Sequence, residues 1–329
     1  MKDAMKRTIR TPADFDFRSA VCSHGFFVLA PNNWDPAIGN LRTVVTLNDE
    51  LAVNVSVCPS NRDVEIRASQ SLSRNQSDQV CQAISRMLRL DENLTPFHRQ
   101  CRSRPSHRQA AQTKFGRLLR SASLFEDVIK VICTCNTSWR QTVSMIEAIV
   151  HHWGVPAGDD RTKGFSTPDR LARVRPATLK KFARVGYRAD CLHRFAKAVA
   201  QGDIVLEELQ HPKRSSDQCY KKFRAIHGIG DYAASHLCML IGHYDRLAID
   251  TEMIRLLRTR YPRRKRTPAA IRNHYAPWHP YQYLAYWYEL WNDYVARHGQ
   301  SDLWAPAQMA TTITSRHAMS ADKHRNTKQ

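Results

Sequence analysis

The stretch that decides the fold is His227–Thr251, which reads HGIGDYAASHLCMLIGHYDRLAIDT. It contains a glycine turn at Gly228 and Gly230, a short apolar segment, a second turn at Gly242, and an apolar run that ends on Asp250. Burying an ionised carboxylate costs several kcal/mol unless something compensates it. Asp250 is therefore the first candidate for a functional group.

Two structures compete for the glycine turn. Residues 228–233 match the pattern G-x-G-x-x-A, and Asp250 follows Gly230 by 20 residues, as in a dinucleotide-binding fingerprint. That fingerprint requires an apolar strand before the first glycine. Here the preceding residues are CYKKFRAIH, whose Cys219, Phe223 and Ile226 share one face of a helix. The pattern favours a helix, a glycine hairpin and a second helix, and the dinucleotide site remains the alternative.

The charge of the chain indicates an acidic partner. The 329 residues carry a formal net charge of +20, and nucleic acid is the commonest partner of such a surface because lysine and arginine displace counterions from phosphates. Glycines can adopt positive φ and let backbone N–H groups approach a phosphate at the start of a helix. The hairpin, with His227, Gly228 and Gly230, is therefore a candidate phosphate-binding site. An ordinary turn between helices is the simpler alternative.

The cysteines and the apolar runs limit the class of protein. Nine cysteines, an odd number, form no C-x-x-C pair, which favours reduced thiols in an intracellular protein. Together with the basic charge, this leads us to expect a DNA-associated location. No cysteine follows Cys238, so a C-terminal four-cysteine iron–sulfur loop is excluded, and we expect neither a metal nor a cofactor. No apolar run approaches membrane-spanning length, so no membrane association is expected.

The pattern along the chain predicts an α+β fold, with a small N-terminal antiparallel β-sheet domain followed by an all-α bundle. The predicted strands are GFFVLA at 25–30, RTVVTL at 42–47, LAVNVSV at 51–57 and DVEIRA at 63–68, followed by a helix around 76–90. The basic stretch 101–117 suits a connection or a phosphate-facing loop. The predicted divisions are a flexible end at 1–13, the sheet domain at 14–99, the helical domain at 100–304 and a disordered tail at 305–329.

Several stretches together resemble the helix-hairpin-helix DNA glycosylases, in particular the 3-methyladenine DNA glycosylase II and 8-oxoguanine DNA glycosylase branches. The hairpin and Asp250 carry the most specific part of this resemblance. Three further stretches are similar to other parts of the family: SASLFEDVIKVICTCNTSWRQTVSMI at 121–146, VGYRADCLHRFAKAV at 185–199 and YAPWHPYQYLAYWYELW at 275–291.

The resemblance implies roles for the residues of the opening stretch. Asp250 falls on the catalytic aspartate of the family, although it can also simply cap the helix that follows. Bifunctional members carry a lysine two positions after the second hairpin glycine, where it forms a Schiff base. Tyr232 stands there, so the resemblance implies a monofunctional enzyme that leaves an abasic site.

The resemblance also implies a wedge and a base pocket, because such enzymes take the base out of the stack. Asn136 and Trp139 are the candidate wedge, and an asparagine between two helices is also a common cap. Tyr232, Tyr283 and Trp287 are the candidate base pocket.

An aromatic stripe is more often core than pocket, but an aromatic pocket suits electron-poor alkylated purines that bind by stacking. The expected partner is double-stranded DNA with damaged bases, bound by a monomer. The alternatives are an 8-oxoguanine-type glycosylase and a non-catalytic DNA-binding module.

Overall fold

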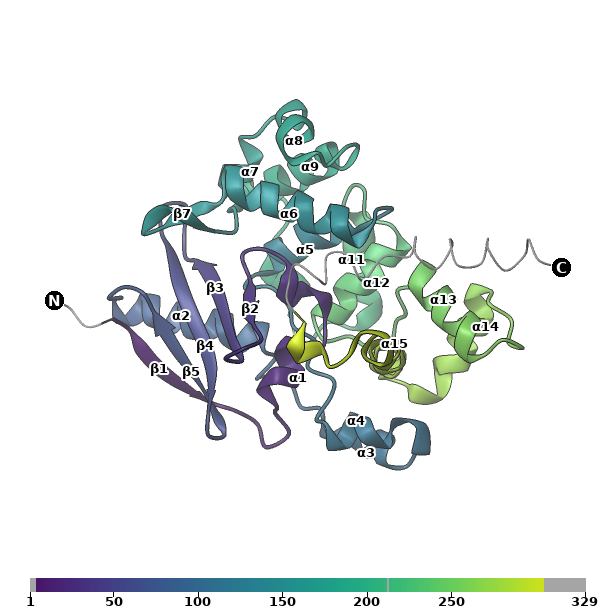
Figure 1. Cartoon of the computed structure of the whole chain (residues 1–329). Helices are drawn as coiled ribbons and strands as arrows, with labels where there is room; N and C mark the ends of the chain where they lie inside the picture. The colour runs from purple at the N-terminus through teal and green to yellow at the C-terminus, as the bar shows by residue number, and fades with distance from the viewer. Residues whose placement is uncertain (1–3, 212, 305–329) are drawn as a thin grey trace, which may run out of the picture.

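A five-stranded antiparallel sheet forms one side of the molecule, and helices form the rest. The computed structural model describes residues 4–211 and 213–304, and within them the strand order is β1-β5-β4-β3-β2. Figure 1 shows the sheet on one side, with α2 across it, and the later helices on the other. The strands are β1 Lys6–Arg10, β2 Asn33–Asp35, β3 Asn40–Thr46, β4 Ala52–Ser60 and β5 Asp63–Ala68. The predicted α+β fold is confirmed.

The central strands pair in a register that places their valines in the core. Val45 lies opposite Val53 and Leu41 opposite Val57, and these side chains are almost fully buried. The helix α2 (Arg74–Met87) begins at a capping box formed by Ser73 and Gln76, and it buries Val80, Ile84 and Met87. The strands expected at 42–47, 51–57 and 63–68 and the helix expected around 76–90 are therefore confirmed.

Two expectations for the N-terminal region are wrong. Residues Lys6–Arg10 of the expected flexible end form the edge strand β1, which pairs with β5 from Lys6 opposite Arg67 to Arg10 opposite Asp63. The expected strand at 25–30 is instead the 3-10 helix η1 (Gly25–Val28), in which all four residues are buried. A segment that is buried on every side shows no alternation of apolar and polar residues, so its sequence does not distinguish the two structures.

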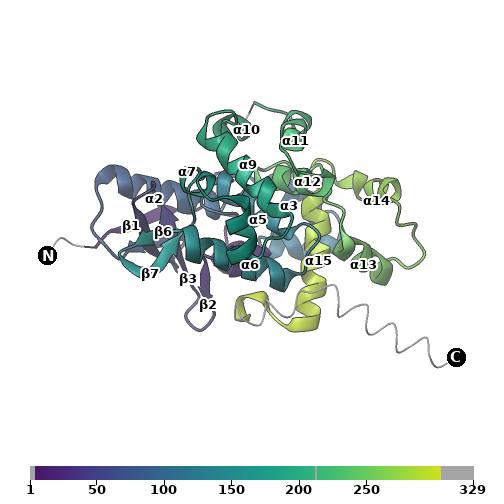
Figure 2. The ribbon, with the colours of Figure 1, turned by 90° about the horizontal axis from the view of Figure 1, so that it is seen from above.

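Helices make up most of the remaining chain. They are α1 Phe17–Val21, α3 Thr95–Arg102, α4 Arg108–Gln112, α5 Leu124–Thr134, α6 Trp139–Trp153, α7 Pro168–Ala172, α8 Pro176–Ala183, α9 Arg188–Ala200, α10 Leu206–Leu209, α11 Ser216–Ala225, α12 Asp231–Leu240, α13 Thr251–Arg260, α14 Pro268–Tyr275 and α15 Gln282–His298, with 3-10 turns η2 Pro105–His107, η3 Ala276–Trp278 and η4 Ser301–Leu303. Figure 2 shows them from above. The basic stretch expected to be a loop, 101–117, contains α4 and buries Ala110. No helix of the described residues is long and apolar enough to cross a membrane.

A second, small sheet interrupts the helices. The strands β6 (Val155–Ala157) and β7 (Asp159–Gly164) form an antiparallel pair next to β3 and β4. Val155 and Ala157 share a small buried cluster with Val44 and Ala52, which explains why this short hairpin is ordered where the sequence suggested only helices. The strands β7 and β3 lie close together at Gly164, because a Cβ atom added there would lie 2.3 Å from Oγ1 of Thr46.

One contiguous cluster of buried residues runs from Met5 to Trp304, through the sheet and the helices. Because this cluster includes residues on both sides of position 99, it marks no boundary there, and the expected division into a sheet domain and a helical domain stays a prediction. The tail at 305–329 lies outside the described residues.

Candidate active site

The glycine turn joins two helices. The helix α11 begins at a capping box of Ser215 and Gln218 and extends to Ala225, and α12 begins directly after Gly230. Because the residues before the first glycine are helical, the dinucleotide-binding alternative is wrong. The helix-hairpin-helix prediction is confirmed.

The two glycines differ in their backbone. Gly228 has a φ of +82°, and a Cβ atom there would lie 2.2 Å from Sγ of Cys191, so both the backbone and the packing against α9 demand glycine. Gly230 has a φ of −84° and caps α12, with open space where a Cβ would lie. Only the first glycine therefore needs positive φ, and His227 beside it is exposed, with Nε2 3.3 Å from Oδ2 of Asp190.

Asp250 sits at the start of α13 and lines a cavity of about 800 Å³. Its Oδ1 accepts a hydrogen bond from the backbone N–H of Met253 at 2.8 Å, so the carboxylate caps the helix and is held in a fixed orientation. Burial raises the pKa of this carboxyl group to about 6, the N–H of Met253 opposes the shift, and the negative charge of Glu252 adds to it. At neutral pH the group is therefore largely ionised.

The predicted base-pocket residues line the same cavity. Tyr283 and Trp287 lie on α15 with their rings stacked, 5.7 Å apart between centroids and 15° between planes. The indole Nε1 of Trp287 donates to the carbonyl oxygen of Ser23 at 2.7 Å, which fixes the ring. Tyr232, in the first turn of α12, is partly buried, and its pKa is raised by burial and by Asp250. The structure thus brings Tyr232, Tyr283 and Trp287 together around one space with Asp250.

The predicted wedge residues also line the cavity: Asn136 lies in the segment between α5 and α6, and Trp139 is the first residue of α6. Asn136 is exposed, has a φ of +50°, and donates from Nδ2 to the hydroxyl of Tyr187 at 3.2 Å. The helix cap is not Asn136 but Ser138, which forms a capping box with Gln141. Trp139 is partly buried with its ring against Gly25, where an added Cβ would lie 2.9 Å from two ring atoms.

Sequence reasoning missed several residues of this cavity, and the polar ones include His24, His236 and Glu252. His236 follows Tyr232 by four residues on α12, and that helical spacing was the available signal. Glu252 binds Arg255 at 2.8 Å and the hydroxyl of Tyr294 at 2.9 Å, both through Oε2. His24 comes from the segment before η1, and no feature of the sequence connects that segment with α12.

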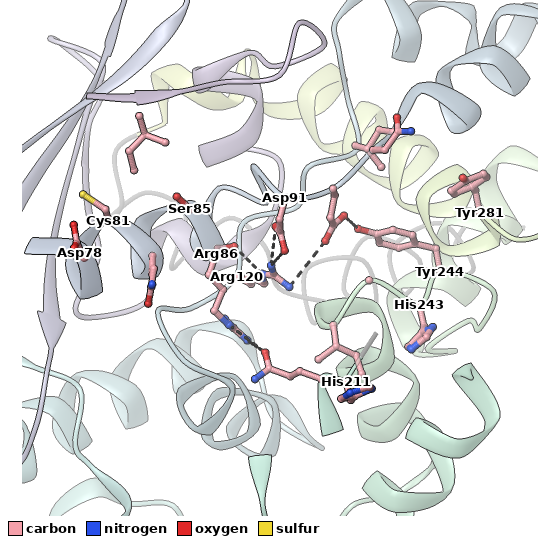
Figure 3. Close-up of a pocket in the computed structure, with 18 residues that line it drawn as sticks. Asp78, Cys81, Ser85, Arg86, Asp91, Arg120, His211, His243, Tyr244 and Tyr281 are labelled. Atoms are coloured by element: carbon pink, nitrogen blue, oxygen red, sulfur yellow. Dashed lines mark hydrogen bonds and ion pairs between the residues drawn. The ribbon is translucent and has the colours of Figure 1, made fainter. Parts of the chain in front are cut away.

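A second cavity, of about 930 Å³, lies between α2 and the turn at 241–244 (Figure 3). Arg120 donates from Nε to the carbonyl oxygen of Arg86 at 2.7 Å and from Nη1 to that of Leu240 at 3.1 Å. Arg86 binds the buried carboxylate of Asp127 at 2.7 Å, and Glu92 accepts from the hydroxyl of Tyr244. These contacts join the first part of the chain to α5 and α12, so they are structural.

No metal centre is visible around either cavity. Among the described residues, no three His, Cys, Asp or Glu side chains lie close enough together to hold a metal ion.

The chain is similar to known proteins of one kind. The family model for the HhH-GPD superfamily base excision DNA repair protein matches residues 129–280, which include α12 and Asp250. A DNA-3-methyladenine glycosylase of Bacillus subtilis is 23% identical over 265 residues, covering 78% of this chain and 83% of that protein.

Two solved structures have the same fold. The 8-oxoguanine glycosylase/lyase of Clostridium acetobutylicum gives a TM-score of 0.69 at 16% identity and covers 88% of this chain and 98% of its own. The 3-methyladenine DNA glycosylase of Archaeoglobus fulgidus gives a TM-score of 0.69 at 18% identity, with 87% and 98% covered. Residues 129–280 thus match the HhH-GPD superfamily of base excision DNA repair proteins, and the chain shares its fold with these two glycosylases.

Proposed function

We propose that this protein is a monofunctional DNA glycosylase. It hydrolyses the N-glycosidic bond of a damaged base, in the first place an alkylated purine, after that base is flipped out of duplex DNA. The observation that carries the proposal is the position of Asp250. Its carboxylate is fixed by the Met253 N–H and lines the cavity that the aromatic rings of Tyr283 and Trp287 also line.

The chemistry follows from the charge that develops as the bond breaks. Loss of the base leaves oxocarbenium-like positive charge on the deoxyribose, and a preoriented carboxylate in a partly desolvated site stabilises that charge or orients the attacking water. The Asp250 side chain is ionised at neutral pH, and its hydrogen bond at the start of α13 fixes its orientation. It can therefore act as this carboxylate.

The absence of a suitable amine supports a monofunctional reaction. Tyr232 occupies the second position after Gly230, and among the described residues no lysine lines the cavity. Lys130 is buried in α5 and binds Glu126 at 2.6 Å. A Schiff base with the sugar requires a neutral amine in contact with it. The expected product is therefore an abasic site in an intact strand.

Alkylated purines fit the aromatic rings best, because such bases are electron-poor and stack well. 8-Oxoguanine is the second candidate, and the shared fold with the 8-oxoguanine glycosylase/lyase of Clostridium acetobutylicum favours it. Position 283 is tyrosine, where a reader of an oxidised purine would be expected to carry an amide.

The DNA partner is supported by the net charge of +20 and by the hairpin, whose helix α12 begins at Gly230 with free space around that glycine. Backbone N–H groups at a helix start bind phosphate without reading sequence. We propose that Gly228, Gly230 and His227 hold one phosphate of a duplex bound by a monomer.

A panel of duplexes, each with one lesion, tests the function. Free base and strand cleavage are measured separately, and borohydride is added to trap any covalent complex. We expect base release from an alkylated purine, strand breaks only after alkali, and no trapped complex. Release from 8-oxoguanine alone would favour the second candidate, a trapped complex would exclude the monofunctional reaction, and tight binding without release of any base would indicate a non-catalytic module.

A further inference from the structure

Two buried histidines lie at the aromatic end of the Asp250 cavity. The rings of His24 and His236 are 5.5 Å apart between centroids, and His24 lies 5.0 Å from Trp287. Only 2% of the surface of His24 and 5% of that of His236 is exposed. These imidazoles come from distant parts of the chain and meet where the aromatic rings would hold a base.

The hydrogen bond of His24 defines its tautomer. Its Nδ1 lies 3.0 Å from the carbonyl oxygen of Leu119, and a carbonyl can only accept, so Nδ1 carries the hydrogen. Burial lowers the pKa of His24 well below its ordinary value, so the ring is neutral. Its Nε2 is therefore an acceptor, and it makes no hydrogen bond within residues 4–211 and 213–304.

His236 leaves one nitrogen without a partner. Its Nδ1 lies 3.1 Å from the hydroxyl of Tyr283, while its Nε2 is buried and has no hydrogen-bond partner among the described residues. A hydroxyl can donate or accept, so Nε2 can act as a donor or as an acceptor. Burial lowers the pKa of this imidazole to about 4, so it also stays neutral at neutral pH.

The other buried histidines show that this is not the general pattern. His98 contacts the Phe115 carbonyl at 2.8 Å through Nε2, and its Nδ1 lies 3.7 Å from Asp14. His107 uses both nitrogens, with the Ser106 hydroxyl at 2.9 Å and the Ala285 carbonyl at 3.2 Å. A buried polar atom without a partner costs stability, so one that lies beside a cavity points to a ligand.

The same cavity holds further atoms of this kind. Nε1 of Trp139 and Oε1 of Glu252 are also buried without a partner in the part of the chain that the structure describes. With His236, the residues that line the cavity thus carry an unpaired donor, an unpaired acceptor and an unpaired group that can be either. Stacking on aromatic rings alone would not require them.

We propose that His24 and His236 form the hydrogen-bonding edge of this pocket and select flipped bases that carry an N–H donor on the edge that faces them. The proposal rests on the proposed function, because it assigns the specificity of the same site. The substrate class is then a purine recognised by stacking and by its polar edge together. A purine without a donor on that edge is a poor ligand even though its ring stacks equally well.

The test measures binding in an Asp250→Asn background, so that the base is not removed during the experiment. The probes are three otherwise identical duplexes that contain hypoxanthine, which has an N1–H donor, unsubstituted purine, which has none, or a tetrahydrofuran abasic analogue. We expect the background variant to bind the hypoxanthine duplex about tenfold more tightly than the purine duplex, the size of one well-formed hydrogen bond.

Adding His236→Phe should bring that ratio to about one, and His236→Gln should keep part of it, since the amide restores a polar group near Nε2. Binding of the tetrahydrofuran duplex should change by less than about twofold in either variant, because no base enters the pocket. His107→Phe is the matched control, since that histidine is as buried as His24 but lies outside the cavity; it should leave the ratio unchanged.

A ratio near one in the background variant, or a ratio that survives His236→Phe, would overturn the proposal. If His236→Phe also weakens binding of the tetrahydrofuran duplex, the variant has lost more than a contact to the base, and the His236→Gln variant is used instead. Its melting temperature shows whether it is folded. A folded His236→Gln variant that does not prefer the hypoxanthine duplex contradicts the proposal. Base release by the wild-type chain is scored separately. Failure to release any base would overturn the glycosylase function while the binding ratio still tests the histidines.

Discussion

Two large cavities in the described part of the chain have similar volumes, about 800 Å³ beside Asp250 and about 930 Å³ beside Arg120, but their polar groups differ. In the Arg120 cavity, no lining residue of the described chain carries a buried polar side-chain atom without a partner. In the Asp250 cavity, three residues do: Trp139, His236 and Glu252.

This difference separates a structural cavity from a candidate active site better than size does. Paired charges in the Arg120 cavity hold α2 against α5 and α12, and each guanidinium is used for that purpose. The unpaired groups beside Asp250 cost stability in the free protein, and a ligand that pairs them recovers that cost.

The largest effect is expected for Asp250→Asn. The amide keeps a cap on α13 but removes the charge opposite the developing cation, so base release should fall at least about 100-fold, while the affinity for lesion-containing DNA changes little. Single-turnover base release measures the first quantity and equilibrium binding the second. Glu92→Gln in the other cavity is the matched carboxylate control. If the Asp250→Asn variant releases the base as fast as the wild type, Asp250 has no part in the mechanism.

Asp250→Asn should also stabilise the fold. The folded-state pKa is about 6 and thus lies above the ordinary value, so the ionised carboxylate destabilises the folded state above about pH 6, and this penalty disappears as the pH falls toward 4. We expect about 1 to 3 kcal/mol of added stability at pH 7.5 and no gain near pH 4, measured by urea unfolding. A loss of stability at pH 7.5 would contradict the direction of the pKa shift.

Arg120→Met tests the structural cavity. Removing the guanidinium takes away the donor to the carbonyl oxygen of Leu240, one donor to that of Arg86, which still accepts from the N–H of Arg89, and the partner of Asp91. Unfolding should therefore become easier by about 2 to 4 kcal/mol. Burial and the neighbouring Arg89 lower the pKa of Arg120 to about 10, which leaves it charged at pH 7. Base release per folded molecule should stay within about twofold of wild type. An Arg120→Met variant that is as stable as the wild type but no longer releases the base would show that the Arg120 cavity also takes part in the reaction.

The pH dependence of base release gives a further test. Because Asp250 must be ionised and its pKa is about 6, kcat/KM should be constant above about pH 7 and fall about tenfold for each pH unit well below 6. The affinity for a tetrahydrofuran duplex at each pH separates this effect from changes in DNA binding. If kcat/KM stays constant down to pH 5, either the pKa of Asp250 lies below 5 or its ionised form is not needed for the reaction.

The smallest effect is expected for Trp287→Phe. The phenyl ring can still stack on Tyr283, but the carbonyl oxygen of Ser23 loses the indole donor, so kcat/KM should fall about two- to fivefold. Trp278→Phe provides the comparison, since Trp278 is buried against His107 outside both cavities; it should change stability but not kcat/KM. Equal losses in the two variants would argue against a pocket role for Trp287.

The local features of the fold follow from neighbouring residues alone. Helical spacing before Gly228, the turn at that glycine and the carboxylate after an apolar run are set by residues within one turn or one element, so they predicted the hairpin and Asp250. The alternation in β4 likewise predicted a strand with a buried face. The strand β1 has no such pattern, because it is a short edge strand with mostly exposed residues.

Only the tertiary structure decided which distant residues meet. His24 precedes His236 by more than two hundred positions, and their rings come together because η1 and α12 share one core. The pKa of Asp250 and the unpaired nitrogen of His236 also depend on burial by other elements. Local propensity has a range of a few residues, whereas desolvation and side-chain pairing act through space. Asp250 and the aromatic residues Tyr283 and Trp287 could therefore be singled out from the sequence and its family resemblance, but the two histidines that line the same cavity could not.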